Sequence, residues 1–274
     1  MTLELFAHPF SSYCQKALIV FYENDIPFTY RMMEDPGVGE ELGSLWPMKR
    51  FPILYENGRT VIETAIIIEY LQLHHPGRVM LIPEDPDLAV EARMLDRFFD
   101  NYVMTPQGKF VFDALRPPES RDPFGVEEAR KMLDTSYEWL DRRMNGRTWA
   151  VGDRFTLADC AAAPSLFYAD WTHRIPEKYE HLAAYRARLL ARPSFARAVE
   201  VARGLLPSLF PAGSAGPRLT GCKSFRTSAR PIFRRKADRL QTASSSDCCY
   251  RHRDNSPWLR LRGSRTGKFP RTAT

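Results

Sequence analysis

Two hydroxyl side chains, Ser11 and Ser12, stand where a short apolar strand gives way to a helix that opens near Tyr13. The N-terminus of a helix presents unpaired N–H groups and a partial positive charge, and a hydroxyl there can donate a hydrogen bond to an anion such as a thiolate. Serine is also a preferred helix N-cap, so position alone leaves a purely structural role open. Cys14 falls on the apolar face of the same helix, which favours a small core residue over a reactive thiol.

A proline opens a strand in the middle of the chain, at Phe51-Pro52. Proline is tolerated at a strand start or an edge, which an ordinary trans peptide would satisfy. A cis peptide at this point would instead turn the Phe51 N–H and C=O outward, where they could pair with an extended peptide ligand. Both interpretations remain open from the sequence.

A carboxylate and a hydroxyl, Glu63 and Thr64, stand at the start of another predicted helix. Such a pair can bind the head group of an amino acid, with Glu63 on the ammonium and Thr64 with the helix amides on the carboxylate. A threonine cap with an acidic first turn is the alternative. Thr156 and Asp159 have the spacing of a capping box, and we expect them to be structural. No His, Cys, Asp or Glu cluster has metal-ligand spacing, so no metal is expected.

The first 78 residues predict a small mixed sheet. Alternating residues 3–7 suit a strand, a 3.6-residue period follows from Tyr13, and Pro27–Met32 suits a second strand. Residues 35–47 are expected to be a Gly/Pro-rich connection with one helical turn. Asn57-Gly58 between two runs rich in β-branched and aromatic residues predicts a hairpin. A helix is expected from Glu63 to about His74.

Residues 88–212 have helical periodicity. A turn-rich stretch at 79–87 predicts a linker, so the expected domains are 1–78, a helical domain 88–212 and a tail 213–274. The predicted helices are Leu88–Phe112, Val126–Met144, Leu157–Tyr168, Tyr179–Ala191 and Ser194–Leu205.

Charge divides the chain unevenly. Residues 1–212 hold 24 Lys+Arg against 30 Asp+Glu, whereas residues 213–274 hold 15 against 3, which together give the net charge of +6. The tail is rich in Arg, Ser and Thr without helical or strand period, and we expect it to be disordered. Its charge would allow nucleic-acid binding, but no nucleic-acid motif accompanies it. No apolar run spans a bilayer, and neither a signal peptide nor a dense cysteine framework is evident, so we expect a cytoplasmic protein.

Taken together and in order, three segments resemble the glutathione transferase superfamily. Leu5–Cys14 is similar to the strand–turn–helix that carries the catalytic Ser or Cys in the theta, delta, zeta and omega classes, Trp46–Leu54 resembles the loop with the family's cis-proline, and Glu63-Thr64 resembles its Glu-Ser/Thr pair. The resemblance covers about residues 1–210. It implies an α/β thioredoxin-like N-terminal domain that binds glutathione, followed by an all-α helical bundle for the second substrate.

The resemblance also implies roles for individual residues. Ser11 would activate the thiol of glutathione, with Ser12 and Tyr13 as alternates, because a slip of one or two residues in the alignment would change the catalyst. The glutathione-binding residues would be Lys49, Arg50, Phe51, Pro52, Glu63 and Thr64. Three side chains of the long helix are candidates for an apolar lining of the second-substrate pocket or for bundle core: Met94, Phe98 and Tyr102.

The expected activity is conjugation of the glutathione thiolate to hydrophobic electrophiles, with glutathione as co-substrate and a homodimer as the expected assembly. Isomerisation or peroxide reduction needs the same thiolate and stays an alternative, as does a fold retained as a non-catalytic binding module. Two-cysteine disulfide exchange is not favoured, because Cys14 has no partner thiol in the Ser11-x-x-Cys14 motif.

Overall fold

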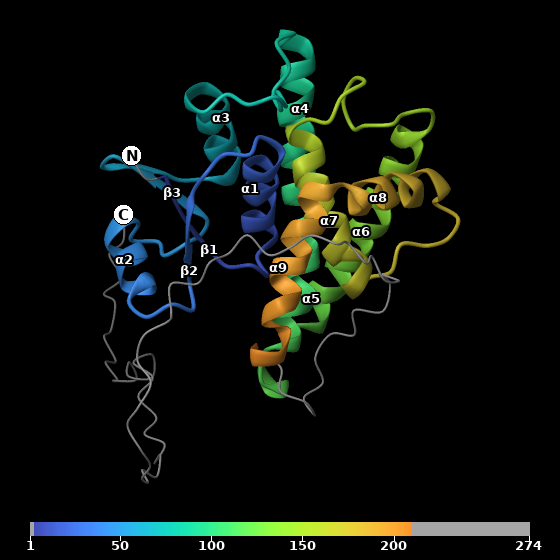
Figure 1. The fold of residues 1–274 in the computed structure, drawn as a ribbon. Helices are drawn as coiled ribbons and strands as arrows, with labels where there is room; N and C mark the ends of the chain where they lie inside the picture. Colours follow the sequence, from blue (N-terminus) through green and yellow to red (C-terminus); the bar gives the residue numbers. More distant parts are fainter. Residues whose placement is uncertain (1–2, 210–274) are drawn as a thin grey trace, which may run out of the picture. The chain divides into compact units, whose positions relative to one another are not determined.

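The structure is a computed structural model and describes residues 3–209; side chains are described as far as residue 203. The predicted tail 213–274 lies outside the described residues. The described part opens with a four-stranded sheet and continues as helices (Figure 1). The predicted fold class is therefore confirmed.

The sheet has the strand order β2-β1-β3-β4. Its central strand β1 runs parallel to β2 and antiparallel to β3, and β3 and β4 form the hairpin that Asn57-Gly58 predicts. The φ angles of Asn57 and Gly58 are 50° and 83°, as a tight hairpin turn requires. The elements of this region are β1 (Glu4–Ala7), α1 (Ser12–Glu23), β2 (Thr29–Met32), α2 (Val38–Leu45), β3 (Ile53–Glu56), β4 (Arg59–Val61) and α3 (Thr64–His74).

Helix α1 is central to the packing. Its side chains from Cys14 to Phe21 are at most 1% exposed, and it contacts α3 on one side and α7 and α9 on the other. One continuous apolar core consequently runs from Leu3 to Ala198. The helices that follow α3 are α4 (Pro86–Phe98), the π-helix η1 (Phe99–Met104), α5 (Thr105–Ala114), the 3-10 helix η2 (Pro118–Ser120), α6 (Pro123–Met144), α7 (Leu157–Thr172), α8 (Glu180–Ala191) and α9 (Pro193–Leu209).

Two sequence predictions about local structure were wrong. The segment 35–47 contains an eight-residue helix, α2, rather than a single helical turn. The predicted long helix 88–112 is broken into α4, η1 and α5, and it begins earlier, at Pro86, where Asp85 caps it by accepting from the Asp87 and Leu88 N–H groups. Proline at the first helical position needs no N–H partner, so it favours this start.

The π-helix follows from Pro106 together with a hydrogen bond from α6. Pro106 has no N–H with which to bond the Tyr102 carbonyl in α-helical register. The Ser136 hydroxyl of α6 donates to that carbonyl instead, over 2.9 Å, and the Thr105 N–H donates to the Asp100 carbonyl five residues back. The neighbouring helix α6 therefore supplies the hydrogen bond that the wide π-helical turn leaves unmade at this carbonyl. It shifts the side chains that follow around the helix axis.

The capping box at the start of α7 is confirmed. Asp159 accepts from the Thr156 N–H over 2.8 Å, and the same carboxylate accepts from the Tyr185 hydroxyl over 2.6 Å. Asp159 is fully buried, so its role is to hold α7 and α8 in place. None of the helices among the described residues is both long and apolar enough to cross a bilayer.

Candidate functional site

The pairing of the strands brings three predicted site segments to one edge of the sheet. β1 ends beside the start of β3, because Phe6 pairs with Ile53, and β4 ends there too, because Val61 pairs with Leu54. The loops that join at this edge carry three of the predicted glutathione-site residues: Ser11, Phe51 and Glu63. The pairing register of the strands therefore brings together three segments that are distant in the sequence.

Ser11 is the N-cap of α1 and is half-buried. Its Oγ accepts a hydrogen bond from the Cys14 N–H over 3.3 Å. A hydroxyl that accepts through a lone pair keeps its hydrogen for a second partner. The cap and the proposed thiol activation therefore do not exclude each other, although the sequence presented them as alternatives. The buried Cys14 sulfur also interacts with this hydroxyl, so it competes with a bound thiol for the same hydrogen.

The alternates to Ser11 are less suited to this role. Ser12 is 5% exposed, so its side chain is turned into the protein. Tyr13 is half-buried, and burial, followed by the charge of Asp100, raises the pKa of its phenol. Cys14 is fully buried, and burial raises the pKa of its thiol to about 12, which keeps it protonated and unreactive. The prediction that Cys14 is a core residue is confirmed.

The peptide bond between Phe51 and Pro52 is cis. Within residues 3–209 the Phe51 N–H and C=O take part in no hydrogen bond, so both are available to an extended peptide. The side chains of Lys49 and Arg50, just before them, are exposed. Lys49 has a φ of 51° and lies against Gly43, where an added Cβ would come within 3.1 Å of the lysine Cε.

Glu63 precedes α3 with a φ of 67° and a ψ of 121°. A side-chain-bearing residue seldom adopts this region, and such strain gathers at functional sites. The Glu63 carboxylate is exposed and makes no hydrogen bond or ion pair in the described part of the chain. Thr64, the first helical residue, is 6% exposed. A free carboxylate beside a helix N-terminus suits the ammonium and carboxylate of an amino-acid head group.

The predicted ligand, glutathione, has groups that are complementary to each of these residues. Its cysteinyl backbone needs an unpaired N–H and C=O, which Phe51 offers. Its γ-glutamyl end needs a free carboxylate and helix amides, which Glu63 and α3 offer. Its sulfur needs a hydroxyl hydrogen at a helix N-terminus, which Ser11 offers. Among residues 3–209, no three His, Cys, Asp or Glu side chains lie together in a way that could hold a metal ion.

The three candidates for the second-substrate pocket do gather in one place. Met94, Phe98 and Tyr102 line a hollow of about 480 Å³ together with Trp139 of α6. Met94 and Tyr102 are about half exposed, which contradicts the bundle-core alternative for these two. No residue of the sheet or of its loops lines this hollow. The part of α4 and η1 that faces α1 carries other residues, Asp96 and Asp100.

A buried charge cluster links α1 to α4 and η1, and the sequence interpretation missed it. Lys16 of α1 is 1% exposed, and its Nζ contacts the carboxylates of Asp96 and Asp100, the latter at 2.8 Å. Arg97 contacts both carboxylates from the solvent side. Lys16 directly precedes an apolar run at residues 17–21, but nothing in the sequence indicates which carboxylates it contacts.

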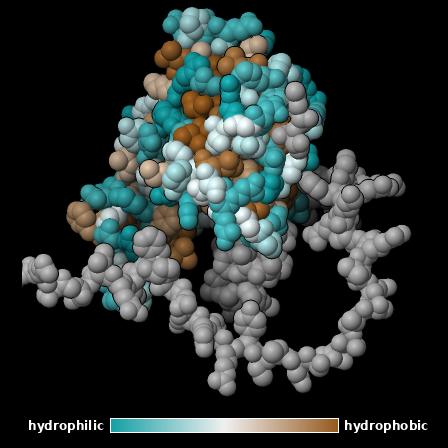
Figure 2. All heavy atoms as spheres, turned by 90° about the vertical axis from the view of Figure 1, so that its left-hand side faces the viewer, coloured by the Kyte–Doolittle hydropathy of each residue, from teal (hydrophilic) through white to brown (hydrophobic). Residues whose placement is uncertain are grey.

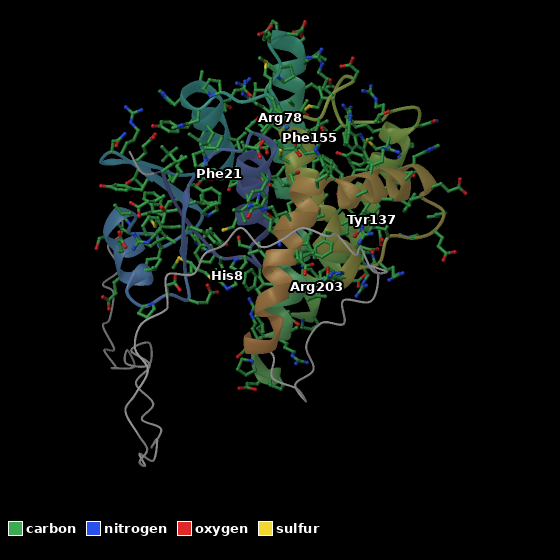
Figure 3. The ribbon with its side chains drawn as sticks, in the orientation of Figure 1. His8, Phe21, Arg78, Tyr137, Phe155 and Arg203 are labelled. Atoms are coloured by element: carbon green, nitrogen blue, oxygen red, sulfur yellow. The ribbon has the colours of Figure 1, made fainter. Side chains whose placement is uncertain are left out.

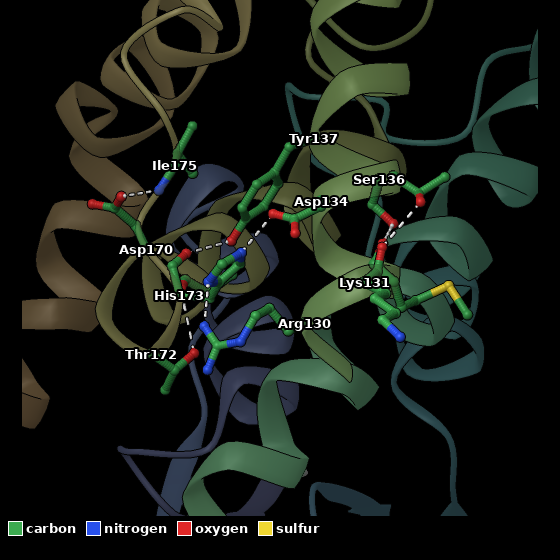
Figure 4. A network of polar contacts seen from close by, with 12 residues as sticks. Arg130, Lys131, Asp134, Ser136, Tyr137, Asp170, Thr172, His173 and Ile175 are labelled. Carbon is green, nitrogen blue, oxygen red and sulfur yellow. Dashed lines mark hydrogen bonds and ion pairs between the residues drawn. The ribbon is translucent and has the colours of Figure 1, made fainter. Parts of the chain in front are cut away.

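A second polar network lies further along the helices (Figure 4). His173 ends α7, and its Nε2 lies 2.6 Å from Asp134 while its backbone carbonyl accepts from the Tyr137 hydroxyl. Its ring stacks between those of Phe110 and Tyr137. These contacts join α5, α6 and α7 and include none of the predicted site residues.

His8 is a further residue of the sheet edge that the sequence interpretation missed (Figure 3). Its Nε2 lies 2.7 Å from the Glu34 carboxylate, and its ring stacks on that of Phe51. The histidine follows β1 directly, three residues before Ser11, and no periodicity or spacing pattern distinguishes it.

A thioredoxin-like sheet with a cis-proline at its edge, followed by a helical bundle, defines the class of protein. The N-terminal domain of glutathione S-transferase matches residues 5–79, and its C-terminal domain matches residues 103–193. The chain belongs to the glutathione S-transferase superfamily.

Individual relatives agree with this family. A probable glutathione S-transferase from Nicotiana tabacum is 32% identical over 114 residues, which are 42% of this chain and 47% of the relative, so the match spans about half of that relative's length. FtsZ-localized protein A from Caulobacter vibrioides is 26% identical over 210 residues, 71% of this chain and 90% of the relative. The crystal structure of a glutathione S-transferase from Methylobacterium radiotolerans, in complex with glutathione sulfonate, is 27% identical with a TM-score of 0.63 and covers 73% of this chain and 95% of its own.

Proposed function

We propose that this chain is an enzyme that transfers the glutathione thiolate to hydrophobic electrophiles. The single observation that carries the proposal is the convergence of the Ser11 hydroxyl, the free Phe51 backbone and the free Glu63 carboxylate at one sheet edge. A relative of known structure, the Methylobacterium radiotolerans protein, holds glutathione sulfonate, which supports the same class of ligand here.

In this proposal glutathione lies extended along the edge. Phe51 pairs with its cysteinyl backbone, Glu63 and Thr64 hold its γ-glutamyl group, and Lys49 or Arg50 neutralises its glycine carboxylate. The sulfur then faces Ser11. Ser12 is buried and burial raises the pKa of the Tyr13 phenol, so we propose Ser11 as the hydroxyl that contacts the sulfur at the N-terminus of α1.

Activation of the thiol is an electrostatic effect. A free thiol with a pKa of about 8.5 is only a few per cent ionised at pH 7. A hydrogen bond from the Ser11 hydroxyl and the partial charge of the α1 N-terminus, each contributing roughly 1 kcal/mol, would lower that pKa by about one to two units. The thiolate then attacks the electrophilic carbon, forms the C–S bond, and the leaving group departs with the bonding electrons.

The proposal is tested by comparing turnover with binding. We expect the purified chain to bind glutathione and to conjugate it to an activated aryl halide. Ser11→Ala should keep most of the binding and lose most of the turnover, because Phe51 and Glu63 still hold the peptide. A chain that binds no glutathione would refute the proposal.

A non-catalytic role is the second candidate, favoured by the 26% identity to FtsZ-localized protein A over 90% of that relative's length. In that case the wild-type chain would bind glutathione or a protein partner without turnover, and Ser11→Ala would change neither. Since glutathione chemistry needs a compartment rich in reduced glutathione, we propose the cytoplasm as its location.

We also propose that the chain forms a homodimer through the outer faces of α3 and α4. Ile66 and Leu73 on α3, and Val90 and Met94 on α4, are exposed apolar side chains. In Figure 2, hydrophobic side chains gather among polar ones on the side of the molecule that bears the sheet. An unpaired apolar face of this kind favours association. Light scattering that reports a monomer at micromolar concentration would contradict the dimer.

A further inference from the structure

Main-chain and ring atoms of His8 hold the turn that leads to Ser11. Its carbonyl accepts from the Ser11 N–H over 3.0 Å, and its own N–H donates to the Cys14 sulfur over 3.4 Å. Its ring Nδ1 accepts from the Phe10 N–H over 3.1 Å. The turn from His8 to Ser11 is therefore closed around this one residue.

The hydrogen bonds assign the tautomer of the ring. The Phe10 N–H can only donate, so Nδ1 carries no hydrogen, and Nε2 carries the hydrogen that it donates to Glu34 over 2.7 Å. Both nitrogens are thus engaged within the protein. His8 has no lone pair left with which to take a proton from a thiol, so it does not act as a general base in this arrangement.

The face of the same ring supports the other part of the site. The His8 and Phe51 rings stack with centroids 6.0 Å apart and planes 18° apart. Phe51 is the residue whose free N–H and C=O lie before the cis peptide bond. Glu34, which orients the ring, comes from the segment between β2 and α2. One side chain therefore touches the Ser11 turn, the Phe51 loop and the β2–α2 segment.

We propose that His8 is a positioning residue for glutathione, with two separable effects. Through Nδ1 it fixes the turn that places the Ser11 hydroxyl, and so it governs the pKa of the bound thiol. Through its ring face it fixes Phe51, and so it governs affinity for the peptide backbone. This inference rests on the proposed function, since it assigns a further residue to the same site.

Two variants separate the effects. His8→Phe keeps a flat ring on Phe51 but has no acceptor for the Phe10 N–H. His8→Asn keeps an acceptor, because its Oδ1 takes the place of Nδ1, but has no ring. His181→Asn is the matched control, because His181 is exposed on α8 and makes no hydrogen bond or ring contact in the described part of the chain. Calorimetry gives the Kd for glutathione, and thiolate absorbance against pH gives the pKa of the bound thiol.

We expect each variant to change one of the two readouts and to leave the other nearly unchanged. His8→Phe should leave the Kd within about twofold and raise the pKa of the bound thiol by roughly half a unit or more. His8→Asn should raise the Kd roughly three- to tenfold and leave that pKa nearly unchanged. A purely structural role would lower thermal stability and shift both readouts together in both variants, which would overturn the proposal.

Of the three variants, Glu34→Ala has the smallest risk of misfolding, because the Glu34 side chain is 32% exposed to solvent. It frees the His8 ring to turn and should weaken glutathione binding about threefold. An unchanged Kd and an unchanged thiol pKa in all three variants would overturn the role of His8 while leaving the proposed function intact. A wild-type chain that binds no glutathione would instead overturn both.

Discussion

Substitution of Lys16 by methionine should destabilise the protein strongly. Lys16 is 1% exposed and lies between two carboxylates, of which Asp96 is 1% and Asp100 9% exposed. Methionine has a similar length but no charge, so it would leave the carboxylates without their buried cation. Removing one partner of a buried ion pair typically costs about 3–5 kcal/mol.

Because of Asp100, we expect the loss of stability in Lys16→Met to depend on pH. Burial raises the pKa of this carboxyl, and the charge of Lys16 opposes that effect. A carboxyl whose pKa is raised on folding contributes stability that is present at low pH and is lost as pH rises through the folded pKa. Without Lys16 the pKa of Asp100 rises further. The destabilisation by Lys16→Met should consequently be largest at neutral pH and should shrink as the pH falls toward 5.

Urea unfolding at pH 7 and pH 5 measures this effect. For a folded region of this size, a loss of 1 kcal/mol in the free energy of unfolding lowers the Tm by roughly 2–4 °C. Thermal unfolding of Lys16→Met at pH 7 should therefore give a Tm lower by about 6–20 °C. Arg142→Met is the matched control, because Arg142 and its partner Glu138 form an exposed pair, and such pairs contribute about 1 kcal/mol at most. A Lys16→Met protein as stable as this control, or one whose loss grows on acidification, would refute the reasoning.

Two further predictions concern the sheet edge. Glu63→Gln should weaken glutathione binding by roughly tenfold, because an amide replaces the carboxylate that pairs with the ammonium group; calorimetry with glutathione measures this, and an unchanged Kd would exclude the assignment. The Cys14 thiol of the native protein should resist iodoacetamide at pH 8, since burial raises the pKa of this thiol to about 12. Rapid labelling of Cys14, read by mass spectrometry, would show instead that the thiol is accessible.

The sequence predicted the elements that local chemistry determines. The hairpin at Asn57-Gly58, the helix that begins after Ser11 and the capping box at Thr156 each follow from short-range rules on turns and caps. The resemblance added the order of the segments and hence the fold class. Ser11, Phe51 and Glu63 were predicted as one site from that order, and the strand register places them at one edge.

The remainder depends on contacts that are distant in sequence. The π-helix arises because Ser136 of another helix satisfies the carbonyl that Pro106 leaves free, and no local pattern announces that partner. Lys16 is buried against Asp96 and Asp100, which lie 80 or more residues away in the sequence. His8 depends on Glu34 and Phe51, which approach it only in the folded sheet. Tertiary partners of this kind decide function without a local signal.

The pKa of glutathione's thiol when bound, in the wild-type protein and in Ser11→Ala, is the measurement that bears most directly on the proposed chemistry. Absorbance of the thiolate against pH reports it without any turnover. We expect a pKa near 7 in the wild type, about one to two units below that of a free thiol, and a return of about one unit toward 8.5 in Ser11→Ala. Equal values in the two proteins would show that the Ser11 hydroxyl does not stabilise the thiolate.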